Sequence, residues 1–486
     1  MRYDGMKSSL LCAKKESEDQ SEAFMIFFVR LLIFWLTNNN LNRFNAGETM
    51  ADHSPTDNDG EEAKRQENEV PVEEAHGGTD GETPATERQW PNMFEETSDM
   101  LAVSILTYGI AEFRQQVREG KITMKQGNLD LPKKFDEASR LIAIHLEDIK
   151  RVAAPASFDL YMTGLNAIID AKELELQKDA SADDGKIIVF DDEHAEQELV
   201  YSIDVNPTGR RVTISFRGSV TVRDAMIDIK LRLVQIPNPV EPGTTVRIHG
   251  GFRDYLYGKA TQFPHRTLEK GEGRKIDTII DRVLEVMDEY PGYYVTVTGH
   301  SLGGSLATLL AFELGALDDD RIQGPVSCFS FASPRVGNLT FANAFQSLER
   351  ARKLRCLRVY NQNDIFPKIP NVDTRNLFGC TCIGSDLIYR HVGVSLKLMQ
   401  DGGYKVVYPL HYQHPVKRTI GDLFGKIHTS RSSVRRILCR ENLARNHSCM
   451  EYWTRLHLNE QALQKMHLHH QYKQVAGREF ELEEDW

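Results

Sequence analysis

Apolar residues recur every three or four positions in three stretches, residues 97–117, 135–153 and 159–177, and this spacing predicts helices. Six later runs rich in β-branched and aromatic residues predict strands, at 186–192, 198–205, 210–218, 293–299, 326–333 and 354–362. Helical patterns at 278–290 and 341–353 lie between the later runs. Strands that alternate with helices predict an α/β fold with a mostly parallel sheet covered by helices on both faces.

Residues 1–96 show no such order, and we expect them to precede the folded domain. The stretch 51–97 is acidic, rich in Pro, Gly, Ser and Thr and poor in apolar residues, which predicts disorder. The apolar run 23–37 is shorter than the roughly 20 residues that span a bilayer, and an acidic stretch precedes it, unlike in a secretory signal. It indicates either an interfacial membrane anchor or part of an extension ahead of Met50.

These patterns predict one folded unit over residues 97–486, with leading helices at 97–180 and a catalytic core at 185–460. The formal net charge of −11 comes largely from the acidic stretch 51–97, and it argues against nucleic acid as a partner. The sequence does not indicate an oligomeric state.

The cysteines and the late histidines predict no metal site. Seven scattered cysteines, an odd number, favour neither a disulfide scaffold nor a zinc site, and they favour a reducing compartment. We therefore expect a cytoplasmic or peripheral membrane location. His467, His469 and His470 are interpreted as a solvated helix face rather than as metal ligands.

One serine stands at a sharp turn between a predicted strand and a helix. Residues 294–298 are typical of a buried strand, Gly299-His300-Ser301-Leu302-Gly303 form the turn, and an apolar helical stretch follows. A strand followed by G-x-S-x-G and a helix exposes the serine Oγ above the sheet, as a nucleophile for acyl transfer requires. The alternative is a Gly-rich turn in which Ser301 is incidental.

Such a nucleophile needs a base, an acid that orients the base, and donors for the oxyanion. Asp364 follows the predicted strand 354–362 in a turn rich in Asn, where a catalytic acid is expected, although an Asp there can also simply cap the turn. The N–H of Leu302, the residue after the nucleophile, is placed by the turn itself as one oxyanion donor.

The chain resembles the class 3 (fungal-type) lipase family of the α/β-hydrolase superfamily. The resemblance rests on six blocks in the order of the family, at 212–229, 248–252, 297–314, 329–342, 357–370 and 389–398. It implies Ser301 as the nucleophile, Asp364 as the acid, and Ser219 in Phe216-Arg217-Gly218-Ser219 as the second oxyanion residue. Arg217 is interpreted as a structural ion-pair residue.

The catalytic histidine is predicted to be His447. The family pattern His-Ser-x-x-x-Tyr-x-x-x-Leu is matched by His447, Ser448, Tyr452 and Leu456. His411 and His414, which follow the strand-like residues 404–410, remain alternatives for the base. His391, expected on a strand, and His249, which precedes the nucleophile, are interpreted as structural.

Two further segments bear on the substrate. In the family a lid follows the oxyanion block, and the equivalent here, residues 230–248, is short and contains Pro237, Pro239 and Pro242. It is interpreted either as a lid or as a loop packed on the core. Residues 417–447 hold eight Lys or Arg against two acidic residues, which favours contact with an anionic membrane or a solvated face.

Together these features predict a serine hydrolase that cleaves acyl esters of glycerolipids through an acyl-enzyme, without cofactor or metal. Two alternatives are a catalytically inactive hydrolase-fold scaffold and a soluble short-chain carboxylesterase. The intact pair Ser301 and Asp364 argues against the scaffold.

Overall fold

The computed structural model describes residues 90–124, 135–152, 158–178, 185–192, 199–219, 232–258, 273–370, 387–407 and 445–472. Every structural statement below refers to these residues. The predicted disorder of 1–89, His411 and His414, and most of the basic segment 417–447 lie outside them.

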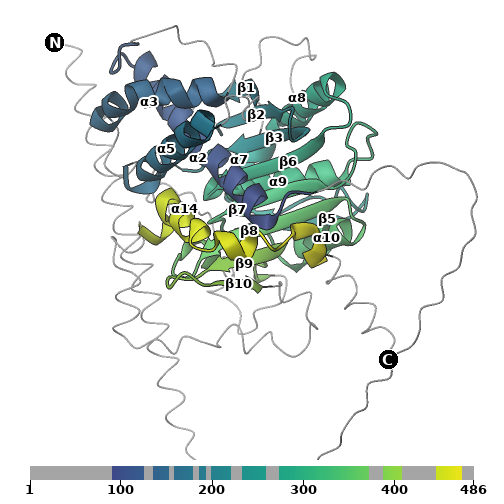
Figure 1. Cartoon of the computed structure of the whole chain (residues 1–486). Coiled ribbons are helices and arrows are strands. Elements are labelled where there is room, and N and C mark those ends of the chain that lie inside the picture. Colours follow the sequence, from purple (N-terminus) through teal and green to yellow (C-terminus); the bar gives the residue numbers. More distant parts are fainter. Residues whose placement is uncertain are drawn as a thin grey trace, which may run out of the picture. The chain divides into compact units, whose positions relative to one another are not determined.

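An eight-stranded sheet runs through the described residues in the order β1-β2-β3-β6-β7-β8-β9-β10 (Figure 1). Its centre, β3-β6-β7-β8-β9, is parallel, and the pairs β1–β2, β2–β3 and β9–β10 are antiparallel. The strands are β1 (Lys186–Asp191), β2 (Tyr201–Asn206), β3 (Arg211–Phe216), β6 (Tyr294–His300), β7 (Val326–Phe331), β8 (Leu354–Asn361), β9 (Val394–Leu398) and β10 (Tyr404–Val407). The predicted strands and the α/β-hydrolase fold are confirmed.

Helices cover both faces of this sheet. One face carries the helices α2 (Met93–Arg118), α3 (Phe135–Val152) and α5 (Thr163–Lys178), the π-helical turn η1 (Phe158–Met162), and the late helices α14 (Cys449–His457) and α15 (Glu460–Leu463). The other face carries α7 (Gly250–Tyr257), α8 (Lys275–Glu289), α9 (Leu302–Ala316) and α10 (Leu339–Arg350). The short 3₁₀ helix η2 (Phe366–Lys368) follows β8.

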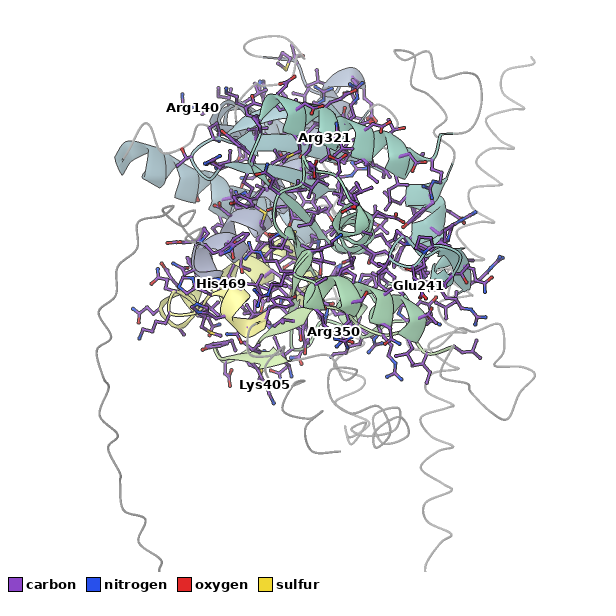
Figure 2. All side chains as sticks on the ribbon, turned by 90° about the vertical axis from the view of Figure 1, so that its right-hand side faces the viewer. Arg140, Glu241, Arg321, Arg350, Lys405 and His469 are labelled. Carbon is purple, nitrogen blue, oxygen red and sulfur yellow. The ribbon has the colours of Figure 1, made fainter. Side chains whose placement is uncertain are left out.

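Strand β7 shows how one strand serves both layers. Phe329 and Phe331 pack with the leading helices, whereas Val326 and Cys328 pack with α9 and its neighbours. All six residues of β7 are buried, as expected for a strand covered on both faces. Charged side chains labelled in Figure 2, such as Arg350 and Lys405, are exposed.

The first helix begins before the expected boundary at residue 97. Asn92 caps α2, because its side chain accepts the N–H of Glu95 while the Glu95 carboxylate accepts the N–H of Asn92. Met93 and Phe94 are buried in the core. The folded part of the chain therefore includes residues that the composition of this region assigned to the N-terminal segment.

Residues 233–249 form a hairpin of β4 (Leu233–Pro237) and β5 (Thr245–His249). Leu233 and Ile236 are buried, and Ile236 packs in the core beside α9. The described part of the expected lid segment is thus a hairpin packed on the core rather than an irregular loop. Pro237 ends β4 at the turn, where its missing N–H interrupts no ladder interior.

Three of the seven cysteines, Cys328, Cys356 and Cys449, lie in the described part of the chain, and all three are buried and free. His467 donates from Nδ1 to the carbonyl of Pro91, 3.2 Å away, and so ties the C-terminal segment to the start of the fold. Within the described ranges no group of three or more His, Cys, Asp or Glu side chains is placed to hold a metal ion. None of the helices described is long and apolar enough to cross a membrane.

Candidate active site

Ser301 stands at the tip of strand β6 in a strained backbone conformation. Its φ of 58° and ψ of −126° are unusual for a residue with a side chain. Glycines permit this turn: Cβ atoms at Gly299 and Gly303 would collide with the backbone of Gly303 and of Phe216 respectively. Ser301 therefore occupies a strained turn between β6 and the start of α9, as the G-x-S-x-G pattern predicts.

Three side chains form a continuous hydrogen-bonded chain. The Ser301 Oγ lies 2.9 Å from His447 Nε2, and His447 Nδ1 lies 2.8 Å from Asp364 Oδ2. The exposed fractions are 2% for Ser301 and 1% for both His447 and Asp364. With Nδ1 donating to the carboxylate, Nε2 is left to accept the serine proton.

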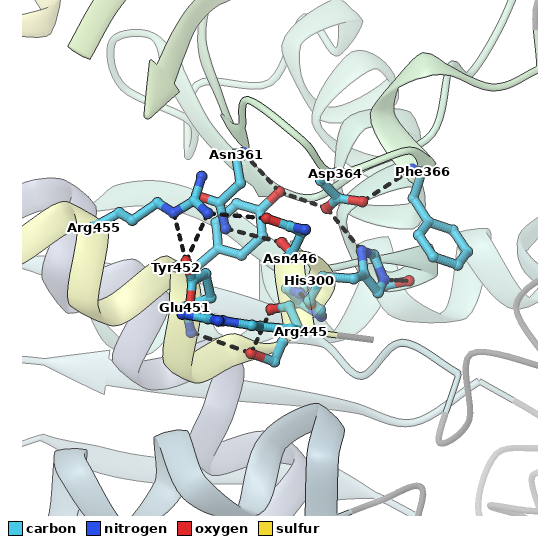
Figure 3. A network of polar contacts seen from close by, with 12 residues as sticks. His300, Asn361, Asp364, Phe366, Arg445, Asn446, Glu451, Tyr452 and Arg455 are labelled. Atoms are coloured by element: carbon cyan, nitrogen blue, oxygen red, sulfur yellow. Dashed lines mark hydrogen bonds and ion pairs between the residues drawn. The ribbon is translucent and has the colours of Figure 1, made fainter. Parts of the chain in front are cut away.

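Asp364 is held by two further donors (Figure 3). The N–H of Phe366 donates to Oδ1 at 3.0 Å, and the hydroxyl of Tyr452 donates to Oδ2 at 2.7 Å. Tyr452 also accepts the N–H of Asn361 at 3.1 Å, which ties it to the end of β8. Burial, followed by the charge of Asp364, raises the pKa of Tyr452 well above its ordinary value, so the hydroxyl stays a donor.

The histidine ring is fixed from both sides. The ring of Phe366 stacks on it, with centroids 3.9 Å apart and 29° between the planes. His300 Nε2 donates to the carbonyl of His447 at 3.1 Å, and the Tyr108 hydroxyl lies 3.4 Å from His300 Nδ1. Burial, followed by the charge of His447, lowers the pKa of His300 well below its ordinary value and keeps that ring neutral.

The expected oxyanion residues adjoin the nucleophile. Leu302 is the first residue of α9, so its N–H has no acceptor within the helix. A Cβ at Gly218 would come within 3.1 Å of Ser301 Cβ and would collide with Tyr108 and the carbonyl of His300, so the loop that carries Ser219 lies against the elbow. The Ser219 Oγ is buried and has no hydrogen-bond partner in the described structure.

His249, His391 and Arg217 contact residues outside the proposed triad. His249 caps α7, since Nδ1 accepts the N–H of Gly251 at 3.1 Å. His391 donates to the carbonyl of Pro367 at 2.5 Å, and it precedes β9 rather than lying on a strand. Arg217 is buried, and the charges of Glu112 and Asp192 are among those that partly offset the lowering of its pKa by burial.

Comparisons with known proteins agree with this picture. The family described as "Lipase (class 3)" matches residues 213–374. The galactolipase DONGLE, chloroplastic, of Arabidopsis thaliana is 32% identical over 213 residues, which are 40% of this chain and 42% of that protein. Phospholipase A1-II 1 of Oryza sativa subsp. indica is 34% identical over 167 residues, which are 34% of this chain and 41% of that protein.

The chain thus spans about two fifths of the length of these curated relatives. Among solved structures, the Rhizomucor miehei triacylglyceride lipase is 23% identical, with a TM-score of 0.35 over 47% of this chain and 71% of that one. The family match contains Ser219, Ser301 and Asp364 but ends before His447.

Proposed function

We propose, from the premise that this chain belongs to the class 3 lipase family, that it hydrolyses acyl esters of glycerolipids through a covalent intermediate on Ser301. The observation that carries the proposal is the chain of short hydrogen bonds from Ser301 through His447 to Asp364, at a serine with positive φ. The relatives are named galactolipase and phospholipase A1, which favours polar glycerolipids as substrates.

In the first half-reaction His447 Nε2 takes the proton of Ser301 as Oγ forms a bond to the ester carbonyl carbon. The N–H groups of Leu302 and Ser219 stabilise the negative oxygen that develops. His447 then gives its proton to the departing alcohol, and the ester C–O bond breaks. Asp364, held by Tyr452 and Phe366, orients the imidazole and stabilises its charged form.

In the second half-reaction water attacks the acyl-enzyme. His447 accepts the proton of this water as its oxygen bonds to the acyl carbon, and it then returns the proton to Ser301 Oγ as the bond between Oγ and the acyl carbon breaks to release the fatty acid. Every proton passes through side chains of this chain, and the proposal includes neither a metal nor an organic cofactor.

A panel of lipids tests this proposal against the scaffold and the short-chain esterase. Wild-type protein should release fatty acid from long-chain phospholipid or galactolipid vesicles, and Ser301→Ala should not. Hydrolysis of short soluble esters alone would favour the carboxylesterase. Turnover of neither class, with a folded protein, would favour the scaffold.

The basic segment 417–447 motivates a second part of the proposal, a peripheral contact with anionic membranes. It carries an excess of six positive charges on an acidic chain, immediately ahead of His447. Each basic residue near an anionic surface contributes about 1 kcal/mol, and salt weakens the attraction. Together with the scattered cysteines, this contact favours the cytoplasm or a membrane surface as the location.

Vesicles of graded phosphatidylserine content test this contact. Activity on anionic vesicles should exceed that on neutral ones at low salt, and Arg435→Glu with Arg436→Glu should remove the difference. Hydrolysis of a soluble ester by the same variant should stay unchanged. Equal activity on both kinds of vesicle at low salt would contradict the contact.

A further inference from the structure

Tyr108 of α2 lies between the turn that carries the nucleophile and the loop that carries the expected oxyanion residue. Its side chain is buried, and its hydroxyl oxygen lies 3.4 Å from His300 Nδ1 and 3.5 Å from the carbonyl oxygen of His300. His300 directly precedes Ser301. Tyr108 also meets Gly218, which directly precedes Ser219, because a Cβ at Gly218 would collide with the Tyr108 oxygen. One side chain of the helical layer thus contacts both parts of the proposed site.

The hydrogen-bond directions around His300 follow from its partners. The carbonyl of His447 can only accept, so His300 Nε2, 3.1 Å away, carries the proton. Burial lowers the pKa of His300 and keeps the ring neutral, which leaves Nδ1 as an acceptor. The Tyr108 hydroxyl therefore donates to His300, and the lone pairs of its oxygen are left to accept.

The donor to the Tyr108 oxygen is the backbone of Gly218. Burial, followed by the charge of Cys449, raises the pKa of Tyr108 well above its ordinary value, and the hydrogen bond from Gly218 is among the interactions that lower it. The backbone group that can donate is the N–H. A continuous path of hydrogen bonds therefore runs from Gly218 through Tyr108 and His300 to the carbonyl of His447.

The loop around Gly218 needs an anchor of this kind. Glycine has the greatest backbone freedom, yet the N–H of Ser219, one peptide further along, must be held in place to stabilise an oxyanion. Arg217, on the other side of Gly218, is buried, and the charge of Glu112 on α2 is among those that raise its pKa against the effect of burial. The helix α2 thus acts on both residues that lead into Ser219.

Tyr108 is itself held firmly. The ring of Tyr161, in the turn η1, stacks on it with centroids 5.0 Å apart and 21° between the planes. The Tyr161 hydroxyl donates to Glu112 Oε2 at 3.0 Å, and Gln116 donates to Oε1 of the same carboxylate at 2.6 Å. Because Glu112 and Gln116 also lie on α2, the helix that carries Tyr108 fixes the ring that packs against it.

We propose that Tyr108 is a positioning residue for acyl transfer, whose hydroxyl joins the oxyanion loop at Gly218 to the nucleophile turn at His300. It acts through these two segments rather than on the substrate. The inference rests on the proposed function, because it requires an oxyanion that develops beside Ser301. It predicts a slower chemical step with substrate binding unchanged.

The rate at which a fluorophosphonate labels Ser301 tests this role without reference to any lipid. Negative charge develops on the phosphoryl oxygen during this reaction, so the oxyanion donors act on it as on an ester. Tyr108→Phe keeps the stacked ring and removes the hydroxyl. We expect it to lower the maximal labelling rate of the folded protein by about 10-fold at an unchanged half-saturating probe concentration.

Tyr257→Phe is the matched control. It removes another buried hydroxyl, which donates to Glu313 at 2.7 Å on the other face of the sheet, and it should label at the wild-type rate. A lower melting temperature of Tyr108→Phe with a wild-type labelling rate would show a structural role alone and overturn the proposal. A change in the half-saturating concentration alone would overturn it as well, because it would assign Tyr108 to probe binding.

The wild-type chain separates this inference from the proposed function. If the wild type is not labelled, the proposed function fails and the role of Tyr108 fails with it, whereas equal labelling of the wild type and Tyr108→Phe overturns only the role of Tyr108. A crystal structure of the labelled wild type decides the matter if Tyr108→Phe does not fold. The Gly218 N–H should donate to the Tyr108 oxygen, and a water molecule or another acceptor in its place would overturn the proposal.

Discussion

The proposed active site joins two regions that are built differently. Ser301 and Asp364 stand on turns that directly follow the parallel strands β6 and β8, where the sheet itself fixes their positions. His447 precedes α14, which packs on the leading helices α2 and α5. The packing is close, because a Cβ at Gly164 of α5 would come within 3.1 Å of Cys449.

Under the proposed mechanism, this difference gives the leading helices a positioning role. They contribute no reacting group, yet they hold the helix that brings His447 and Tyr452 to the end of β8. Tyr452 joins the two regions, because its hydroxyl contacts both Asp364 and the N–H of Asn361. The site is complete only when the helical layer is docked on the sheet.

Breaking either region at its reacting group should have the largest effect. We expect Ser301→Ala and His447→Ala each to lower kcat by about 10⁴- to 10⁶-fold, and the double variant to lose almost nothing more, because the triad acts as a unit. Steady-state kinetics on a glycerolipid measures this. Ser347→Ala on α10 is the control, and full activity in His447→Ala with loss in His411→Ala or His414→Ala would contradict the assignment.

Truncating the chain at the start of the helical layer should have the second largest effect, which is on the free energy of unfolding. Removing residues 1–88 leaves the contacts of α2 in place, so the melting temperature should hardly change. Removing 1–96 deletes Glu96, which leaves Arg355 buried without its partner at a cost of about 3–5 kcal/mol, and it also deletes the buried Met93 and Phe94, so the total loss of stability should be larger. Chemical unfolding compares the two truncations.

Point variants at the start of α2 separate the lost ion pair from the lost helix turn. Glu96→Ala should cost about 3–5 kcal/mol, which is only part of the effect of the longer truncation, whereas Glu95→Ala, at an exposed position, should cost only the capping contact, about 1 kcal/mol. Equal stability of the two truncations would show that the helical region does not depend on Glu96.

A buried histidine outside the proposed triad, His249, predicts acid sensitivity. Burial lowers the pKa of His249 to about 4, against about 6.5 in an unfolded chain. The folded state therefore binds this proton less readily, and stability falls as the pH drops from about 6.5 to about 4, by about 3 kcal/mol in all.

His249→Asn should remove this part of the pH dependence, because Asn also caps a helix but does not titrate. Urea unfolding between pH 4 and 7 measures the slope, with the exposed His470→Asn as the control. An unchanged slope in His249→Asn would contradict the assignment.

The smallest expected effect on kcat comes from removing the Tyr452 hydroxyl, which joins the helical layer to the end of β8. Tyr452→Phe removes one hydrogen bond to a carboxylate, worth about 1.5–3 kcal/mol, so kcat should fall by about 10- to 100-fold with KM nearly unchanged. Tyr404→Phe on β10 is the control. A rise in KM alone would assign Tyr452 to substrate binding instead.

Local sequence patterns predicted the sheet and the turns that follow its strands well. Strand periodicity and the glycines around Ser301 are signals that span only a few consecutive residues. The start of α2 was missed because the capping pair Asn92 and Glu95 lies in a stretch with the composition of a disordered segment. The hairpin β4–β5 was missed because its three prolines favour a loop.

Long-range contacts could not be predicted from local patterns. The sequence placed Tyr452 in the family pattern around His447 but did not indicate its bond to Asp364, and His300 and Phe366 received no role. These contacts join residues up to 147 positions apart, as in the bond between His300 and His447. The partnership of Glu96 with Arg355, 259 positions away, is of the same kind.

Labelling with a fluorophosphonate tests the central claim most directly, because this probe reacts only with an activated serine. Intact mass and peptide mapping should show one adduct per wild-type chain, on Ser301, with none on Ser301→Ala and labelling at least about 10³-fold slower on His447→Ala. An adduct on another serine, or labelling of His447→Ala at the wild-type rate, would contradict the account.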